Sequence, residues 1–262
     1  MMAYTFISGA TGGIGKAFSK ECAKKGYDLF LTGRNQEKLD ELAFELESIY
    51  HIKTIVYACD LTDSDKRRSL IDYARSQGAV FDRIIHVAGV DVQKAFMDYS
   101  VEKVSMQLQV NAVATVELTH GLLQLKDTNT ELIVISSMSG VSPMPYFALY
   151  SATKSMLTNF FTALHYELKG QGVKVTCVLP GGVPTREDVK QAIKEQGFWG
   201  RISAKSPEFV AQKSLKAVKR NKVKYIPGFF NKVLNFIMKI VPKGLVLRFI
   251  ARRWKKLSKD AF

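Results

Sequence analysis

The chain has 262 residues, of which 47% are hydrophobic and 24% are charged, so it is long and apolar enough to form a large buried core. Its formal net charge is +14, but residues 222–262 hold 11 lysines and arginines and a single acid, Asp260, so most of the excess charge lies in this tail. Three irregularly spaced cysteines and four histidines without metal-ligand spacing argue against a disulfide framework and against a metal site.

Short apolar runs alternate with longer segments of helical periodicity along the first 226 residues. The expected strands are Tyr4–Ser8, Asp28–Thr32, Thr54–Ala58, Ile84–Val87, Leu132–Ser136, Lys174–Leu179 and Val223–Ile226. The clearest expected helices are Gln36–Ile49, Ser64–Ser76 and Val101–Leu125. This alternation predicts an α/β fold, a Rossmann-like doubly wound parallel sheet of about seven strands in a three-layer α/β/α domain over residues 1–226. No basic segment precedes the first strand, so we expect a cytoplasmic protein.

Residues 227–262 have a different pattern and form a predicted C-terminal helical extension. Two apolar stretches rich in Lys and Arg, Phe229–Ile240 and Leu245–Leu257, are separated by Pro242, Lys243 and Gly244. Neither reaches the roughly 20 consecutive apolar residues of a membrane span. The tail has three interpretations. It folds over the domain as a lid or dimer element, it lies on an anionic membrane through residues 229–257, or, least favoured because the core has no nucleic-acid module, it binds nucleic acid.

A glycine-rich loop follows the first expected strand and leads directly into a helical pattern. Its residues are Ser8, Gly9, Ala10, Thr11, Gly12, Gly13, Ile14 and Gly15. Glycines at such a place allow a tight turn and let the backbone approach a pyrophosphate, which the helix N-terminus attracts. The alternative is a merely tight strand-to-helix turn.

The end of the second strand indicates which cofactor is preferred. A site for NAD usually has an acid about 20 residues after the glycines, but this place reads Thr32-Gly33-Arg34-Asn35. A guanidinium suits a 2′-phosphate, so the sequence favours NADP(H) over NAD(H), unless Arg34 is only a solvated surface residue. After the third strand, Asp60, followed by Leu61, either accepts a hydrogen bond from the adenine or caps the helix that starts near Asp63.

A tyrosine and a lysine four residues apart, Tyr150 and Lys154, share one face of an expected helix. Ser137 lies at the end of the fifth strand, and Pro180, Gly181, Val183 and Thr185 follow the sixth. All these residues lie at the carboxyl ends of strands, where open α/β sheets bind ligands. The sequence therefore predicts one ligand-binding site at that edge.

With these motifs the chain resembles the short-chain dehydrogenase/reductase family over residues 3 to about 226. The resemblance implies a catalytic tetrad of Asn111, Ser137, Tyr150 and Lys154. It also implies that Lys154 holds the nicotinamide ribose, Ser137 binds the substrate oxygen, and Asn111 holds a water that returns the proton. The family's Asn-Asn-Ala-Gly segment corresponds here to His86, Val87, Ala88 and Gly89, so both asparagines are missing. This departure puts a sheet-stabilising hydrogen bond in doubt rather than the chemistry.

The expected chemistry is transfer of a hydride between NADPH and a carbonyl or alcohol, with Tyr150 as the proton donor. A neighbouring ammonium favours the phenolate, so we expect Lys154 to lower the pKa of Tyr150. A drop of about three units would represent roughly 4 kcal/mol, of which Lys154 would supply much. The segment 185–206 resembles a substrate lid, and its aromatic residues suggest an apolar pocket for a lipophilic ketone or aldehyde, namely Phe198 and Trp199 together with Met144, Tyr146 and Phe147. We expect a homo-oligomer, either dimer or tetramer. The rival functions are a catalytically silent NADP-binding regulator or scaffold and a membrane-surface protein.

Overall fold

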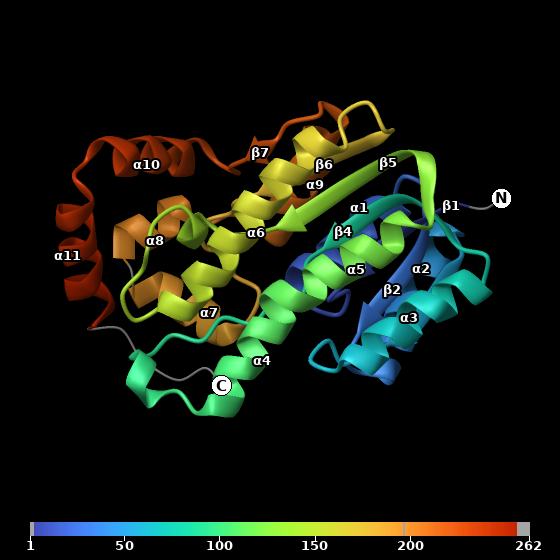
Figure 1. Cartoon of the computed structure of the whole chain (residues 1–262), viewed down its shortest axis with the longest axis horizontal. Helices are drawn as coiled ribbons and strands as arrows, with labels where there is room; N and C mark the ends of the chain where they lie inside the picture. The colour runs from blue at the N-terminus through green and yellow to red at the C-terminus, as the bar shows by residue number, and fades with distance from the viewer. Residues whose placement is uncertain (1–2, 196, 256–262) are drawn as a thin grey trace.

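The computed structural model describes residues 3–195 and 197–255 and contains one seven-stranded parallel sheet in the order β3-β2-β1-β4-β5-β6-β7 (Figure 1). Its strands are β1 (Ala3–Ser8), β2 (Asp28–Gly33), β3 (Thr54–Ala58), β4 (Val80–His86), β5 (Lys126–Ile135), β6 (Val173–Val178) and β7 (Lys224–Tyr225). Every strand that the sequence predicts is present, which confirms the expected fold class. The main difference is that β5 begins at Lys126, before the apolar run that predicted it.

Helices cover both faces of this sheet. One face packs against α1 (Gly13–Ala23), α2 (Gln36–Tyr50) and α9 (Pro207–Lys219), and the other against α3 (Ser64–Ser76), α5 (Ala114–Leu123) and α6 (Ala148–Glu167). Side chains alternate between the faces along each strand, so Phe6 of β1 lies in the α3–α5–α6 layer and Ile7 in the other. Because both layers are apolar and filled, the central strands are buried on both sides.

The long helix predicted from Val101 is divided in the structure. It comprises α4 (Val101–Leu108), a π-helical segment η2 (Gln109–Val113) and α5. Periodicity alone could not show the interruption, because a single π turn changes the helical phase by only one residue. The interruption lies at Asn111, a residue of the predicted site.

The remaining elements gather near the carboxyl ends of the strands, at the left of Figure 1. They are η1 (Phe96–Asp98), η3 (Met138–Gly140), α7 (Glu187–Glu195), α8 (Gly197–Ser203), α10 (Phe229–Ile240) and α11 (Lys243–Trp254). The two predicted tail helices therefore exist, α10 with the predicted bounds. They lie beside the edge at which ligands bind in sheets of this topology.

Strand order reverses direction at β1, which has β2 on one side and β4 on the other. At such a switch point the loops after the two strands diverge and leave a crevice at the carboxyl edge of the sheet. Here the loop after β1 is the glycine loop, and the loop after β4 contains Ala88 and Gly89. The fold therefore brings the sequence-predicted motifs to one crevice.

Candidate active site

The glycine loop is packed so closely that side chains would not fit. Gly9 has a φ of 66°, and a Cβ there would lie 2.9 Å from the Cα atom of Ala88. A Cβ on Gly15 would lie 2.1 Å from the Gly9 carbonyl oxygen, and one on Gly13 would lie 2.7 Å from the Thr185 Cβ. The first helix, α1, begins at Gly13 without a side-chain cap, so its backbone N–H groups remain available to an anion. This arrangement fits the pyrophosphate of a dinucleotide.

Ser8 joins the glycine loop to the loop after β4. Its hydroxyl oxygen accepts hydrogen bonds from the backbone N–H groups of Val87, at 3.2 Å, and Ala88, at 3.3 Å. His86 is buried, and its Nε2 atom lies 3.0 Å from the Thr119 Oγ1 atom. Hydrogen bonds from this segment to the neighbouring β1 and α5 therefore exist although both asparagines are missing.

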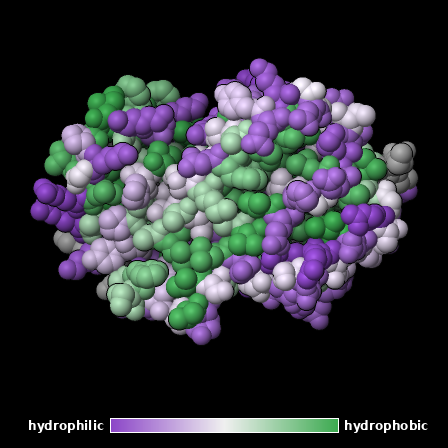
Figure 2. Space-filling view, viewed as in Figure 1, coloured by the Kyte–Doolittle hydropathy of each residue, from purple (hydrophilic) through white to green (hydrophobic). Residues whose placement is uncertain are grey.

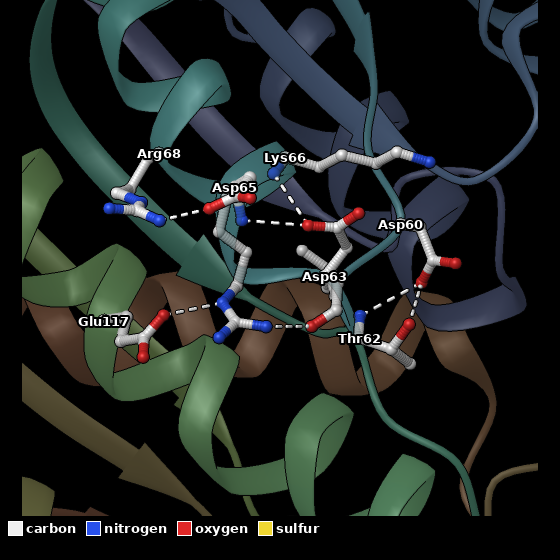
Figure 3. A network of polar contacts seen from close by, with 9 residues as sticks. Asp60, Thr62, Asp63, Asp65, Lys66, Arg68 and Glu117 are labelled. Atoms are coloured by element: carbon white, nitrogen blue, oxygen red, sulfur yellow. Dashed lines mark hydrogen bonds and ion pairs between the residues drawn. The ribbon is translucent and has the colours of Figure 1, made fainter.

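The loops after β2 and β3 lie where the adenosine end of the cofactor would bind. Arg34 is exposed, and its charge helps to lower the pKa of Asp60, although the backbone hydrogen bond from Thr62 is the largest cause. The Asp60 carboxylate accepts from the Thr62 backbone N–H at 3.0 Å and from its hydroxyl at 2.8 Å (Figure 3). Asp63, rather than Asp60, caps α3, because its side chain accepts from the N–H groups of Asp65 and Lys66. The capping alternative for Asp60 is therefore wrong.

The side chains of Ser137, Tyr150 and Lys154 line one cavity. Tyr150 and Lys154 come from the first turns of α6, and Ser137 from the end of β5 just before η3. The Lys154 ammonium donates to the Ile135 carbonyl oxygen at 2.9 Å and lies 5.6 Å from the centre of the Tyr150 ring. A Cβ on Gly89 would lie 3.2 Å from that ammonium, so the glycine leaves the room that the lysine occupies. The predicted spacing thus brings phenol and ammonium together.

Burial shifts the pKa values of both groups. It lowers the pKa of Lys154 to about 8, since removal from water disfavours the charged ammonium. It raises the pKa of Tyr150, with Asp91 acting in the same direction and a hydrogen bond to Ser137 acting against it. The expectation that the Tyr150 pKa is lowered is therefore wrong for the protein by itself, because desolvation of the phenolate dominates.

Asn111 occupies the π-helical segment η2 and is fully buried. Its side-chain oxygen accepts from the Val90 backbone N–H at 2.7 Å, and its amide donates to the Val90 carbonyl oxygen at 2.8 Å. A longer bond of 3.3 Å joins the amide to the Thr153 hydroxyl, one residue before Lys154. Asn111 thereby connects the loop after β4 to α6, and π-helical turns of this kind often occur at functional sites.

The turn after β6 forms another wall of the cavity, through Pro180, Gly181, Val183 and Thr185. The Pro180 carbonyl accepts from the Met138 backbone N–H at 2.9 Å, which fixes this turn against η3. A Cβ on Gly181 would lie 2.9 Å from the side-chain amide nitrogen of Asn231, a buried residue of α10. That amide donates to the carbonyl oxygens of Ser203, at 3.0 Å, and Pro227, at 2.8 Å. These bonds hold the tail helix α10 next to the turn after β6.

The cavity has a volume of about 970 Å³ and extends from these residues to the two tail helices. Its apolar lining from α10 and α11 consists of Phe230, Leu234, Ile237, Met238, Leu245, Val246, Phe249, Ile250 and Trp254, and the polar Asn231 and Arg253 line it as well. Met144 and Phe147 contribute to the lining as expected, and Tyr146 does not. The side chains of Phe198 and Trp199 lie outside the described part of the structure. The tail helices thus form part of the cavity wall, as expected of a lid.

Two aromatic rings are stacked in a column on the ring of Tyr150 and form a roof over it. Phe147 stacks on Tyr150 with 4.4 Å between ring centres, and Trp254 of α11 stacks on Phe147 at 5.5 Å. At the mouth of the cavity, Arg186 and Asp91 form an ion pair of 3.0 Å. The sequence reasoning missed Trp254, Asn231 and this ion pair. No local signal could have found them, because each acts on residues far away in the chain.

The described residues contain no group of three or more His, Cys, Asp or Glu side chains that could hold a metal ion. Within the same residues, no helix combines the length and the hydropathy that crossing a bilayer requires. The glycine loop and the lining of the cavity by Ile14, Gly89 and the turn after β6 together fit a nicotinamide dinucleotide.

Comparison with known proteins agrees with this geometry. The very-long-chain 3-oxoacyl-CoA reductase of Anas platyrhynchos is 30% identical over 192 residues, which are 70% of this chain and 61% of that protein. The chain thus spans about three fifths of the length of that relative. A solved structure from work on 7β-hydroxysteroid dehydrogenase stereoselectivity has a TM-score of 0.84 and 25% identity, covering 95% of this chain and 96% of the other.

L-sorbose reductase from Gluconobacter frateurii, solved with NADPH and L-sorbose, shares the fold with a TM-score of 0.74 at 24% identity, over 86% of this chain and 94% of that one. The family model described as short chain dehydrogenase matches residues 3–196, which is most of the chain. The protein therefore belongs to the short-chain dehydrogenase family.

Proposed function

We propose that the protein is an NADPH-dependent reductase of a lipophilic ketone or aldehyde, with an acyl-chain or steroid-like substrate. One observation supports this most: Ser137, Tyr150 and Lys154 line a single cavity that continues into an apolar space under the tail helices. A catalytically silent NADP-binding regulator would not need these three groups to face a common space. A bound nicotinamide would supply the hydride, and the chain would supply the proton.

The proton would come from Tyr150. Because burial raises the pKa of this phenol, it stays protonated at neutral pH and can donate to a substrate oxygen that gains negative charge. Ser137, whose hydroxyl already interacts with the phenol, would hold the same oxygen. The Lys154 ammonium, with a pKa of about 8, is mostly charged at pH 7 and would stabilise the phenolate that remains. It would also bind the nicotinamide ribose.

The proton on Tyr150 must then be replaced. Asn111 holds the backbone of Val90 with both ends of its amide, beside Thr153 and the ammonium. In this position it would order a water that passes a proton toward Lys154 and Tyr150. The role of Asn111 is therefore to position the relay rather than to titrate.

The preference for NADPH rests on Arg34. Arg34 is exposed at the end of β2. Its positive charge helps to lower the pKa of Asp60, and the adenosine would bind between these two side chains. A guanidinium there can bind a 2′-phosphate with paired charged hydrogen bonds. Asp60 would accept from the adenine amino group, and Leu61, Ala88 and Gly89 would contact the nucleotide.

The preference for a lipophilic substrate rests on the lining of the cavity. At about 970 Å³ the space exceeds the need of the nicotinamide end alone, and its outer part is lined by aromatic and aliphatic residues of α10 and α11. The 3-oxoacyl-CoA reductase and the 7β-hydroxysteroid dehydrogenase among its relatives carry names with large apolar substrates. We further propose that the protein is a cytoplasmic dimer or tetramer, and a lipophilic substrate suits an enzyme that works next to a membrane.

Substitution of Tyr150 tests the assignment. We expect Tyr150→Phe to abolish NADPH oxidation with a panel of ketones of increasing chain length, while NADPH binding, measured by its fluorescence, is nearly unchanged. Turnover like that of the wild type would refute the role of the phenol. If the wild-type protein binds NADPH but oxidises it with no carbonyl of the panel, the regulator hypothesis is favoured instead.

A further inference from the structure

Helix α10 has two apolar faces, and only one of them is covered. Phe230, Leu234 and Met238 point toward the cavity, whereas Phe236 and Ile240 are 63% and 65% exposed. Phe229, seven residues before Phe236 and therefore on the same side of the helix, is 82% exposed. We call Phe229, Phe236 and Ile240 the outer stripe. Burial of the inner face already fixes α10 to the domain, so the fold does not require a second apolar face.

Cationic side chains border the outer stripe. From Phe229 to Trp254 the sequence contains six lysines and arginines and no acid. Lys232 and Lys239 are exposed on α10, and Arg248 and Arg252 on α11. Figure 2 shows hydrophobic residues between hydrophilic ones over α10, at the upper left of the molecule. A helix with an apolar stripe and flanking cations is suited to the boundary between anionic headgroups and acyl chains.

The positive charge beside the outer stripe also favours a lipid bilayer over a second copy of the chain as the partner of this surface. In a two-fold dimer the same patch meets itself, so the uniformly positive borders would face each other and repel. An anionic lipid surface neutralises them instead. We propose that the outer stripe and its flanking cations dock on an anionic lipid bilayer, with α10 lying flat in the interface and the cavity opening toward the lipid.

Some residues of the same two tail helices are exposed and also line the cavity. Ile237, Leu245 and Phe249 are 46%, 57% and 64% exposed, and all three also line the cavity. An apolar rim of this kind would be covered by acyl chains once the stripe is inserted. A lipophilic carbonyl compound dissolved in the bilayer then enters the cavity without crossing water. This delivery step, unlike the docking itself, rests on the proposed function.

Docking is tested with the full-length protein and vesicles, without cofactor or substrate. We expect co-sedimentation with vesicles of phosphatidylglycerol and phosphatidylcholine that weakens with added salt, and little with phosphatidylcholine alone. The pair Phe236→Ser and Ile240→Ser should lower the partition coefficient roughly tenfold or more. Lys232→Gln and Lys239→Gln should each lower it roughly fivefold. Phe44→Ser is the matched control, because Phe44 is 74% exposed on α2, outside the tail, and should leave binding unchanged.

Two results would overturn the docking. One is vesicle binding by the Phe236→Ser, Ile240→Ser protein that equals the wild type while it retains the wild-type melting temperature. The other is a dimer in solution that the same double variant dissociates, since this would assign the stripe to a second copy. Both readouts are independent of any turnover.

Delivery is tested by kinetics. For a long-chain ketone carried in anionic vesicles, the double variant should show a KM raised several-fold at unchanged kcat, and for a water-soluble ketone both constants should stay as in the wild type. An equal change for both substrates would refute delivery from the bilayer. Absence of NADPH oxidation with every carbonyl would overturn the proposed function and the delivery step together, while the sedimentation result still decides the docking.

Discussion

His86, the last residue of β4, should make the protein unusually sensitive to acid. Its ring is fully enclosed, and burial lowers its pKa to about 3. Among the described residues its Nδ1 atom has no hydrogen-bond partner, so a proton added there would have no acceptor. In the unfolded chain a histidine titrates near 6.5. Between these two values the unfolded state binds the proton and the folded state does not, so stability falls as the pH decreases from about 6.5 to about 3.

The size of the effect follows from the two pKa values. At pH 4 the difference from the unfolded value is about 2.5 units, which corresponds to about 3 kcal/mol of unfolding free energy. This is a large part of the stability of an ordinary domain. Urea denaturation at pH 7 and pH 4 measures this loss of unfolding free energy. The comparison protein is His86→Asn, because asparagine cannot titrate and is the residue that the family pattern has at this position. Carboxylates contribute equally to both proteins and cancel.

We expect the loss of unfolding free energy between pH 7 and pH 4 to be about 3 kcal/mol smaller in His86→Asn than in the wild type. The absolute stability of the variant at pH 7 does not matter, because only the difference between the two pH values is compared. If wild type and variant lose the same free energy, the histidine titrates normally in the folded protein. The argument that burial keeps its ring neutral would then be refuted.

Other predictions concern the cofactor, the roof and the lysine. Arg34→Ala should weaken NADPH binding roughly tenfold or more in a fluorescence titration. If the affinity for NADH falls by the same factor, Arg34 does not contact the 2′-phosphate. Trp254→Ala should raise KM for bulky ketones more than for small ones at unchanged NADPH affinity, whereas a uniform effect would deny it a place in the pocket wall. Since burial lowers the pKa of Lys154 to about 8, this group should add to the unfolding free energy as the pH rises from 8 to about 10. Over this range Lys154→Met should therefore lose unfolding free energy relative to the wild type in denaturation curves without cofactor, and an equal change in both proteins would refute the lowered pKa.

Much of this molecule can be predicted from the sequence because its signals are local. Apolar runs give all the strands, and the periods of Gln36–Ile49 and Ser64–Ser76 give α2 and α3 almost residue for residue. The meeting of Ser137 with Tyr150 and Lys154 follows from one rule, that parallel strands end at the same edge. Each of these inferences needs only the spacing of residues and the topology of the sheet.

What could not be predicted depends on burial and on distant contacts. The sequence shows that an ammonium follows Tyr150 by one helical turn, but not how much water surrounds the phenol, and the direction of its pKa shift depends on that. Likewise, nothing near Phe147 indicates that Trp254 stacks on it, or near Gly181 that Asn231 fills the space beside it. The sequence of the tail is compatible with a lid, a dimer element or a membrane contact, because it does not show where the tail lies on the domain.

The position of the tail connects these findings. Phe147 stacks on Tyr150, Trp254 of α11 stacks on Phe147, and burial raises the pKa of the phenol further above neutrality, which suits a proton donor. In the proposed function, the apolar wall formed by the same two helices selects the substrate, and their outer stripe meets the lipid phase in which such a substrate dissolves. A polar substrate would need neither the apolar roof nor the stripe. The chemistry of the donor, the lining of the cavity and the outer surface of the tail therefore all favour reduction of a lipophilic carbonyl.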